Sequence, residues 1–560
     1  MNRLFLIFIF VFGTGFGQEY PQDYFDNPLK IPLILSGSFG ELRGNHFHSG
    51  LDIKTQQRIG IPVYAPADGF ISRIKVAHYG YGKALYIKHP NGYSTVYAHL
   101  KEYGGDIQKY VKNNQYKKET FEVELFPDTA LLQVKKGDLI AYTGNTGSSG
   151  GPHLHYEIRD VSSRPMNPLL FGVDIPDTRK PIVNSVFAYP INEEAFVNDS
   201  FRPIKLRLIK QKDGSYITDT VLASGNIGFG ISTNDQQDGA SNKNGVYQIK
   251  TSFNGEELIN IDFNKFSFSE TRYLNRYIDY KYYKDNRNRV QKLFRENNNP
   301  LSIITYANRN GIISVQDGFK SSFVITLNDF KGNTVTVTVP VEAKGIENRF
   351  IKEHDETMEF VSSETASTIN TGNFTIYVPK GALYENEYLN IKTKGDTLIL
   401  HEDVVPIHKN ISVSMDISKY SDLDRSKVFL GRLNYKGEPY YNRSRLKGNV
   451  LSIGTRTFGT YILAMDSIAP KIKAVNFSEG KWISKNKTLK VKITDDLSGI
   501  SKYRATINGK FILMEYNYKK NVLTYDFDDA IISESENNLK IIVTDNVGNN
   551  TTFEAQFFRK

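Results

Sequence analysis

The sequence predicts a mostly β protein, with one domain of antiparallel sheet followed by about three β-sandwich domains. Phe and Tyr supply nearly all of the aromatic content of 12%, and these side chains are enriched on pleated sheets. Short alternating strands separated by Gly, Pro and Asn-Gly turns recur along the chain, which is typical of all-β domains. At about 150 residues per domain, the length of 560 residues corresponds to about four domains.

The amino terminus predicts export. Residues 1–17 contain one Arg, a short apolar run and the small residues Gly15 and Gly17, which is the pattern of a cleavable signal peptide. The apolar run is shorter than the about 20 residues of a comfortable membrane-spanning helix, although an uncleaved anchor is the alternative. We therefore expect a protein of the periplasm or the extracellular cell envelope, with no stable membrane span.

Composition restricts the chemistry and the partners. The chain has no Cys, which excludes disulfides, thiolate metal sites and a cysteine nucleophile. Its net charge is +9 and its pI is about 9.0, which suits an anionic partner such as cell wall or a membrane surface. Export makes a nucleic-acid partner unlikely, so we expect none.

The first domain is expected at residues 18–175. Its segment 60–100 alternates short apolar strands with an Asp68-Gly69 turn and an Asn91-Gly92 turn. Such dipeptides between apolar runs are strong hairpin signals. We therefore expect antiparallel sheet with little helix here.

Two later regions, 176–344 and 466–560, share a pattern that predicts related β-sandwiches. Each begins with an Asp, three residues and a Pro, in "DTRKPIV" and "DSIAPKI", and ends with strand, Asp-x-x-Gly-Asn, strand. The Gly-Asn suits a tight turn between the last two strands of a sandwich. On these motifs the two regions resemble bacterial immunoglobulin-like modules.

The region between them, 345–465, is again rich in strands and is predicted to be a third β-sandwich. An insertion at 272–299 in the first sandwich is predicted to be partly helical. Its mixture of Tyr, Lys and Arg could contact glycan or form a solvated face with aromatic packing.

Histidines concentrate in the first domain, which points to a site there. Seven of the ten lie at or before residue 155. His153 and His155 follow the glycine-rich loop 143–152, and residues i and i+2 of a strand point to the same face. The pair could therefore bind metal or could simply pack.

His48 and Asp52 form a second candidate pair, four residues apart with Gly50 between them. A straight strand of four residues spans roughly 13 Å, so both side chains reach one ion only if the chain bends at Gly50. His48, Asp52 and His155 would make a catalytic type of zinc site, with three protein ligands and a fourth position open. Spacing alone leaves another divalent ion possible.

Two histidines remain as candidates for proton transfer. His99 ends the alternating strand "STVYAHL", and His153 shares a strand face with His155. Either could orient water, accept its proton or stabilise an oxyanion.

Three motifs, "FGELRGNHFHSGLDI", "YAHL" and "TGNTGSSGGPHLHYEI", together resemble the lysostaphin-type, or LytM-type, zinc metallopeptidases over roughly residues 30–172. Members of that family are endopeptidases of bacterial peptidoglycan. The resemblance implies that His48, Asp52 and His155 bind one Zn²⁺ and that His99 and His153 are catalytic. All five positions are filled, whereas degenerate members that activate other wall hydrolases have lost ligands.

The sequence departs from that family in an insert at 103–133, rich in Lys and Tyr. The insert is expected to act as a lid that narrows substrate choice, or to form an extra surface hairpin. His46 lies beside the site and is expected to support it rather than to bind metal. His78 and His89 have no role in the family.

These observations predict an exported zinc metalloendopeptidase that hydrolyses peptide bonds in peptidoglycan stem peptides or cross-links. Its partners would be peptidoglycan and, through the C-terminal β modules, a protein of the envelope. The alternatives are a non-enzymatic LytM-type scaffold that activates another wall hydrolase, an exported protease acting on glycine-rich proteins, and an adhesin.

Overall fold

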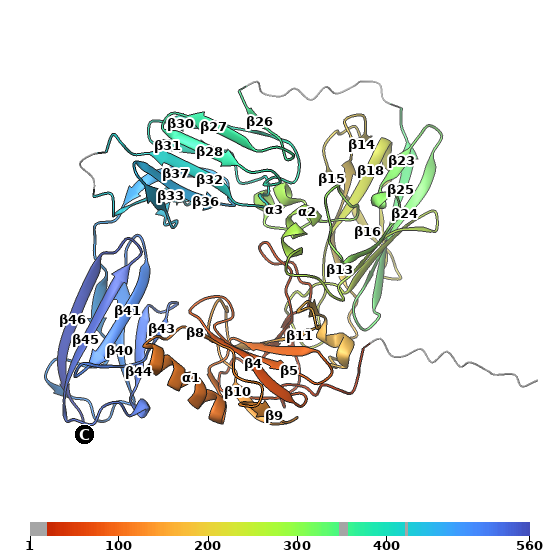
Figure 1. Ribbon diagram of the computed structural model, residues 1–560. Helices are drawn as coiled ribbons and strands as arrows, with labels where there is room; N and C mark the ends of the chain where they lie inside the picture. Colours follow the sequence, from red (N-terminus) through yellow and green to blue (C-terminus); the bar gives the residue numbers. More distant parts are fainter. Residues whose placement is uncertain (1–19, 346–356, 421–423) are drawn as a thin grey trace, which may run out of the picture.

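A computed structural model describes residues 20–345, 357–420 and 424–560, so the predicted signal peptide lies outside the described residues. The prediction of a mostly β protein is confirmed, and four parts of the chain lie around a ring (Figure 1). Among the described residues, no helix combines the length and the apolar character needed to cross a membrane.

The N-terminal domain, residues 20–175, is built on two sheets. Its larger, nine-stranded sheet has the order β1-β2-β11-β6-β5-β4-β8, with β12 beside β11 and β9 beside β4. The strands of that sheet are β1 (Leu35–Gly37), β2 (Leu51–Lys54), β4 (Gly69–Val76), β5 (Lys83–Lys88), β6 (Ser94–Ala98), β8 (Val123–Leu125), β9 (Gln133–Val134), β11 (His153–Arg159) and β12 (Pro165–Met166). The smaller sheet and the helical turn after it comprise β3 (Pro62–Tyr64), β10 (Leu139–Tyr142), β7 (Glu102–Tyr103) and the 3₁₀ helix η1 (Pro168–Phe171).

Of the two predicted hairpins in this domain, one is confirmed and one is wrong. Strands β5 and β6 pair in antiparallel fashion across the Asn91-Gly92 turn. The strands on either side of Asp68-Gly69 instead enter different sheets, because β3 pairs with β10 and β4 pairs with β5 and β9. The Asp68 carboxylate accepts the Lys136 backbone N–H at 2.8 Å, so it ties this turn to a distant loop rather than closing a hairpin.

The insert at 103–133 contains one helix and two short strands that both pair with β4, so the expectation of an extra surface hairpin is wrong. Helix α1 (Gly105–Lys118) begins without a side-chain cap and ends at Glu119, whose φ is 47°. One side of α1 buries Ile107 and Val111 against the domain. The other side faces the C-terminal end of the chain (Figure 1).

The first β-sandwich region continues directly from the N-terminal domain, and the buried side chains of the two parts form one apolar core. Phe266 is 1% exposed and its ring lies 5.2 Å from that of Phe39 and 5.5 Å from that of Phe47. The backbone N–H of Leu35 donates to Gln237 Oε1 at 2.8 Å. This region is therefore packed into the N-terminal domain rather than linked to it by a free tether.

Thirteen strands form this region, and the long strand β18 joins its layers. One part of β18 pairs with the parallel strand β25 and the other part with the antiparallel strand β13, and Gly225, with φ of 73°, lies between the two pairings. The strands are β13 (Ile182–Pro190), β14 (Phe196–Val197), β15 (Ile204–Leu206), β16 (Leu208–Lys210), β17 (Tyr216–Thr218), β18 (Val221–Asn234), β19 (Gln248–Phe253), β20 (Glu256–Asp262), β21 (Gln291–Lys292), β22 (Ile304–Ala307), β23 (Ile313–Val315), β24 (Lys320–Asn328) and β25 (Thr334–Ala343). The predicted partial helicity of the insertion is confirmed by η2 (Thr271–Tyr273), α2 (Leu274–Tyr277) and α3 (Tyr280–Asn286), and η3 (Asn308–Gly311) follows later.

The next region has its own apolar core between residues 361 and 461. It consists of two five-stranded sheets and one two-stranded ribbon. Its strands are β26 (Glu359–Val361), β27 (Ser367–Thr371), β28 (Phe374–Val378), β29 (Glu387–Leu389), β30 (Ile391–Lys394), β31 (Thr397–Leu400), β32 (Ile411–Asp416), β33 (Val428–Leu433), β34 (Pro439–Tyr440), β35 (Arg445–Lys447), β36 (Val450–Thr455) and β37 (Gly459–Met465).

The C-terminal module packs a four-stranded and a five-stranded sheet around a third apolar core. The predicted turn between its last two strands is confirmed, as is the matching turn of the first sandwich, because β45 pairs with β46 and β24 with β25 in antiparallel fashion. The elements are β38 (Lys471–Ala474), β39 (Lys481–Trp482), β40 (Thr488–Thr494), β41 (Ile500–Ile507), β42 (Lys510–Phe511), β43 (Met514–Asn517), β44 (Val522–Asp526), η4 (Phe527–Asp529), β45 (Glu536–Asp545) and β46 (Asn550–Phe558).

This C-terminal module closes the ring by contacting α1 of the N-terminal domain (Figure 1). Asp529 accepts hydrogen bonds from Lys112 and, at 2.5 Å, from the Tyr116 hydroxyl. Glu119 pairs with Arg504 at 2.6 Å. Aromatic rings also meet there, because the ring of Tyr79 lies 4.6 Å from that of Tyr518 and the ring of His78 lies 5.5 Å from that of Tyr516. The contact is therefore mixed polar and aromatic, whereas the first sandwich shares a continuous apolar core with the domain.

Candidate metal centre and active site

Two neighbouring strands bring the first candidate residues together. Asp52 on β2 and His155 on β11 are directly paired across the antiparallel ladder, so their side chains lie side by side on one face. His48 lies just before β2, and the chain bends between it and Asp52 at Gly50. A Cβ at Gly50 would lie 2.3 Å from the Tyr156 carbonyl oxygen, so only glycine fits this bend.

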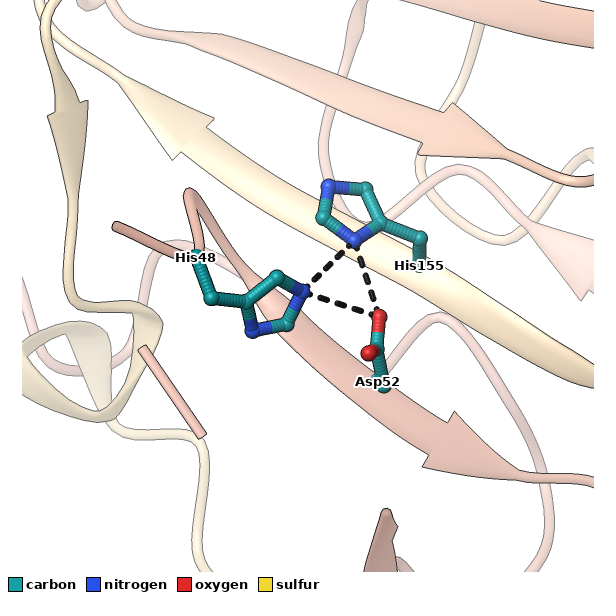
Figure 2. A group of neighbouring side chains, drawn as sticks. All are labelled: His48, Asp52 and His155. Atoms are coloured by element: carbon teal, nitrogen blue, oxygen red, sulfur yellow. Dashed lines mark hydrogen bonds and ion pairs between the residues drawn. The ribbon is translucent and has the colours of Figure 1, made fainter. Parts of the chain in front are cut away.

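The three side chains converge on one point (Figure 2). His48 Nε2 lies 3.0 Å from Asp52 Oδ1 and 3.0 Å from His155 Nδ1, and the last two atoms are 2.9 Å apart. Tetrahedral ligands at metal distances of 2.0–2.1 Å would be about 3.3 Å from one another. The three donor atoms are therefore arranged closely enough to share a single ion, and all three residues are buried.

Hydrogen bonds outside this group fix which atom of each side chain faces the centre. His48 Nδ1 donates to the Ser38 carbonyl at 2.7 Å, which leaves Nε2 as the inward atom. Arg43 donates to Asp52 Oδ2 at 3.0 Å, which leaves Oδ1 inward. Orienting partners of this kind hold ligands in place and select the tautomer of an imidazole.

Glu157 is the orienting partner of His155 and was not among the residues predicted from the sequence. Its Oε1 lies 2.8 Å from His155 Nε2, so Nδ1 is the inward atom of that imidazole. Glu157 is completely buried and also accepts hydrogen bonds from Ser49 and Tyr81. Burial alone would raise the pKa of Glu157, but Arg159 and His155 lower it well below its usual range. The i+2 spacing from His155 on one strand was the signal that could have revealed it.

Two buried carboxylates, Asp52 and Glu157, favour positive charge at the centre. Burial opposes a charge on His155, but its contacts with Asp52 and Glu157 raise its pKa to about 9. The same two carboxylates favour any cation at this point, including a metal ion. Protons and metal therefore compete for the centre.

His99 and His153, the other two predicted site residues, lie beside this group. Their ring centroids are 4.7 Å apart, and His153 Nε2 is 3.4 Å from Asp52 Oδ1. His99 Nδ1 contacts the Thr146 carbonyl at 2.9 Å and His153 Nδ1 contacts the Gly151 carbonyl at 2.9 Å. In both residues Nδ1 is thus the donor to the backbone. Nε2 of His99 is available to the cleft, and Nε2 of His153 faces Asp52 Oδ1.

The conformation of His99 indicates a functional constraint. Its φ is 59°, in the left-handed region that costs free energy for a residue with a Cβ. Burial, together with the nearby His155 and His153, lowers the pKa of His99 to about 3. His99 is therefore neutral near pH 7.

A cleft surrounds these side chains, and its walls come from two parts of the chain. Tyr81, loop residues 148–150 and the exposed His46 line it from the N-terminal domain, while Phe268 and Thr271 line it from the first sandwich. The Phe47 backbone N–H donates to Thr271 Oγ1 at 2.8 Å, which anchors that second wall.

The remaining predicted residues lie away from the metal group. His46 lines the cleft but is not one of the three convergent residues. His89 is buried, with Nδ1 2.8 Å from the Asp68 carbonyl and Nε2 2.8 Å from Thr95 Oγ1, and His78 stacks on Phe121. Residues of the insert are absent from the cleft lining described for this part of the chain.

The C-terminal module reaches the rim of this cleft. Lys519 Nζ donates to the carbonyls of Asn145 at 2.8 Å and of Ser149 at 2.5 Å. The Tyr518 hydroxyl donates to the Gly147 carbonyl at 3.2 Å. One turn of the last module thus holds the loop that carries part of the cleft wall.

Two imidazoles and a carboxylate around one point, beside two further oriented imidazoles in an open cleft, define the class of mononuclear metallohydrolases. Residues 46–116 and 130–168 match Peptidase family M23. This part of the chain is therefore an M23 peptidase domain of the lysostaphin, or LytM, type. A second match, described as a Zu5-like domain, covers residues 358–466.

Curated relatives match the same part of the chain. An uncharacterized metalloprotease of Haemophilus influenzae is 37% identical over 168 residues, which is 29% of this chain and 30% of that protein. The DD-carboxypeptidase/endopeptidase Mpg of Neisseria meningitidis serogroup B is 35% identical over 23% of this chain and 24% of its own length. The peptidoglycan DD-endopeptidase ShyA of Vibrio cholerae is 34% identical over 21% of this chain and 22% of its own length. The similarity thus spans less than a third of each relative.

Proposed function

We propose that this protein is an exported zinc metalloendopeptidase that hydrolyses peptide bonds in peptidoglycan stem peptides or cross-links. The main support is the convergence of His48 Nε2, Asp52 Oδ1 and His155 Nδ1 within 3.0 Å of one another. The M23 domain supports the peptidase activity. The name of the Vibrio cholerae relative, a peptidoglycan DD-endopeptidase, supports the substrate class and a location in the cell envelope.

The donor set fits zinc. Two imidazole nitrogens and one carboxylate oxygen, without sulfur, suit Zn²⁺ and leave a fourth position for catalysis. Zinc held by His48, Asp52 and His155 would supply Lewis acidity toward a carbonyl oxygen and would acidify water. Arg43 and Glu157 keep the donor atoms of Asp52 and His155 directed inward.

His99 and His153 are proposed to handle the proton and the developing negative charge. Each donates Nδ1–H to a backbone carbonyl, so each Nε2 accepts a proton while the ring is neutral and donates one once the ring is protonated. An acceptor can take the proton of the attacking water, and a donor can stabilise the oxyanion or protonate the leaving amine.

The cleft is proposed to bind an extended peptide between the M23 domain and the first sandwich. Phe268, which is 44% exposed, offers an apolar surface on one side, and its ring is fixed by the Arg159 guanidinium at 4.7 Å. Tyr81 lies on the M23 side. The sandwich would therefore contribute to substrate choice and not only to placement of the enzyme.

The test measures bound zinc and the release of muropeptides from purified peptidoglycan by a chain that begins at Tyr20. His155→Ala should lose both zinc and cleavage, because one of three ligands is gone. His99→Asn should retain zinc and lose cleavage by about 10²–10⁴-fold, since Asn tolerates the left-handed backbone of His99. His401→Asn is the matched control, because His401 also has a positive φ, of 51°, but lies outside the M23 domain, and it should change neither quantity.

Three results would contradict the proposal. A zinc-loaded protein that leaves peptidoglycan intact but digests a glycine-rich protein would be a protease of another class. A protein that neither retains zinc nor cleaves peptidoglycan, but stimulates another wall hydrolase, would be a scaffold. Equal cleavage by wild type and His155→Ala would exclude the proposed centre.

A further inference from the structure

The Asp residues of the two repeated motifs form a pair of matching clusters outside the active site. In the first sandwich, Asp177, Asp235 and Asp329 each direct a carboxylate oxygen to within 4.8 Å of the others. In the C-terminal module, Asp466, Asp495 and Asp545 do the same. The motif Asp residues, which the sequence suggested only as parts of turns, therefore meet in space in both modules.

The same asparagine holds both clusters in the same way. Asn333 Nδ2 donates to Asp329 Oδ2 at 2.7 Å and to the Asp177 carbonyl at 3.1 Å. Asn549 Nδ2 donates to Asp545 Oδ2 at 2.7 Å and to the Asp466 carbonyl at 2.8 Å. The Asn of each Asp-x-x-Gly-Asn motif thus joins the first residue of its module to the turn between the last two strands.

A buried carboxylate oxygen without a partner distinguishes the first cluster from an ordinary turn. Asp235 is 7% exposed, yet its Oδ1 has no hydrogen-bond donor. Leaving such an atom buried and unpaired costs free energy that native structures usually avoid. The oxygen therefore points to a ligand.

A second unpaired oxygen lies beside it. Asn244 is 5% exposed and its Oδ1 also lacks a partner. Asn244 and Asp235 form an antiparallel bridge, so their side chains lie on the same face, and both line one cavity with Asp177. In the C-terminal cluster the corresponding unpaired atom is Oγ of Ser498, which is 3% exposed.

The charges around the first cluster leave it anionic. Arg179 is the nearest cation, but its guanidinium donates to Gln236 Oε1 and to the Ala240 carbonyl, and Lys331 pairs with Asp174. Asp238 adds a further negative charge near Asp177. Because the carboxylate oxygens of Asp177, Asp235 and Asp329 lie within 4.8 Å of one another, the cluster gains from any added positive charge.

We propose that Asp177, Asp235 and Asp329, with Asn244 Oδ1, bind a divalent cation of the calcium class, and that Asp466, Asp495 and Asp545 form a second such site. Carboxylate and amide oxygens are the ligands that Ca²⁺ prefers. The absence of His from both described clusters separates them from the imidazole-rich centre of the M23 domain.

Each site lies at the start of its module. Asp177 directly follows the M23 domain, and Asp466 ends the region matched as Zu5-like. A cation bound there connects the first residue of the module to the turn at residues 329–333 or 545–549. It thereby fixes the orientation of the module relative to the domain before it. The same sandwich also carries the cleft wall formed by Phe268 and Thr271.

The test is equilibrium dialysis of the zinc-loaded full chain against ⁴⁵Ca²⁺, which leaves the M23 centre filled. The wild type should bind two calcium ions per chain, Asp235→Asn one, Asp495→Asn one and the double variant none. Asp317→Asn, an exposed acid of the same sandwich, is the matched control and should still bind two. Retention of one zinc per chain shows that the M23 domain of each variant is folded, and an unchanged circular dichroism spectrum shows the same for the β modules.

A wild type that binds no calcium would overturn the proposal. So would two bound ions in Asp235→Asn, or a loss of the same size in Asp317→Asn. Hydrogen exchange provides a measurement that does not depend on variants. Calcium should slow the exchange of backbone amides at 329–333 and 545–549 in the wild type, and unchanged exchange at both turns would equally overturn the proposal.

Discussion

The first sandwich and the C-terminal module carry the same Asp and Asn arrangement, yet they contact the M23 domain in opposite ways. The first shares a continuous apolar core with it, through side chains such as Phe266. The second touches it through ion pairs, hydrogen bonds and separate aromatic contacts, among them Lys83–Glu515 at 2.8 Å, Arg504–Glu119 at 2.6 Å and the Tyr79–Tyr518 rings 4.6 Å apart. Two modules with the same Asp and Asn arrangement therefore contact the M23 domain differently.

The first sandwich should therefore be a fixed wall of the cleft, whereas the contacts of the C-terminal module should be releasable. Burial of large apolar side chains contributes several kcal/mol and is lost only with the fold. The Arg504–Glu119 pair, which is exposed on both sides, contributes about 0–1 kcal/mol and is weakened by salt. We expect the first sandwich to remain part of the catalytic unit, and the C-terminal module to release its contacts much more easily.

The largest loss of stability should follow from removing an apolar side chain between the M23 domain and the first sandwich. Phe266→Ala removes a ring that is 1% exposed, and such a truncation costs about 3–5 kcal/mol of stability. Chemical denaturation of the M23 and first-sandwich unit would measure this loss. Phe268→Ala, two residues away at a 44% exposed position, is the control and should alter cleavage more than stability. Equal stability of the two variants would contradict the idea of a shared core.

A smaller change in stability should come from the cluster of Asp177, Asp235 and Asp329, and this change should depend on pH. The pKa of Asp235 is raised from 3.8 to about 7 in the folded state, so the native protein binds more protons than the unfolded chain between about pH 4 and pH 7. Its stability without calcium should therefore fall as pH rises through that window, by on the order of 2–4 kcal/mol.

Asp235→Asn should abolish that dependence, because the amide does not titrate. Thermal unfolding in chelator at pH 5, 6, 7 and 8 would measure it, with Asp317→Asn as the control that keeps the wild-type slope. Parallel pH profiles for wild type and Asp235→Asn would show that Asp235 does not carry the repulsion.

The smallest change in stability should come from removing the contact between Lys519 and the loop at the cleft rim. Lys519→Ala removes the donors to the carbonyls of Asn145 and Ser149, at a cost of about 1 kcal/mol or less. Amide exchange in residues 143–151 should become faster, and the stability of the M23 domain should hardly change. The adjacent exposed Lys520 makes the matched variant Lys520→Ala, which should leave exchange unchanged. Equal exchange in both variants would mean that this contact does not restrain the loop.

The sequence predicted the five central side chains because their chemistry is local. His48 and Asp52 flank a glycine bend, and His153 and His155 share one face of a strand, so spacing proposed these four as candidates. The family resemblance gave all five, His99 included, their expected roles. The positions of Glu157 and Arg43 could not be proposed so readily. Their roles depend on which nitrogen of His155 and which oxygen of Asp52 face the centre, and spacing carries no information about that choice.

The pairing of the strands on either side of a turn also could not be predicted from local sequence alone. Asn91-Gly92 joins two strands that pair with each other, whereas Asp68-Gly69 joins strands of different sheets. Both dipeptides favour a reversal of the chain, but the partner of each strand depends on distant segments. The helix in the insert likewise became visible only in the structure, where its apolar side packs on the sheet and its polar side meets the C-terminal module.

The sequence by itself determined the β class, the Gly50 bend and the candidate donor set, because strand alternation and the needs of one small ion act over a few residues. Only the tertiary structure decided that Phe268 and Thr271 form a wall of the cleft, that Lys519 holds its rim, and that six motif aspartates meet as two clusters. These contacts join residues tens to hundreds of positions apart. They depend on the burial of apolar surface and on the balance of charge in the folded chain, which no local pattern encodes.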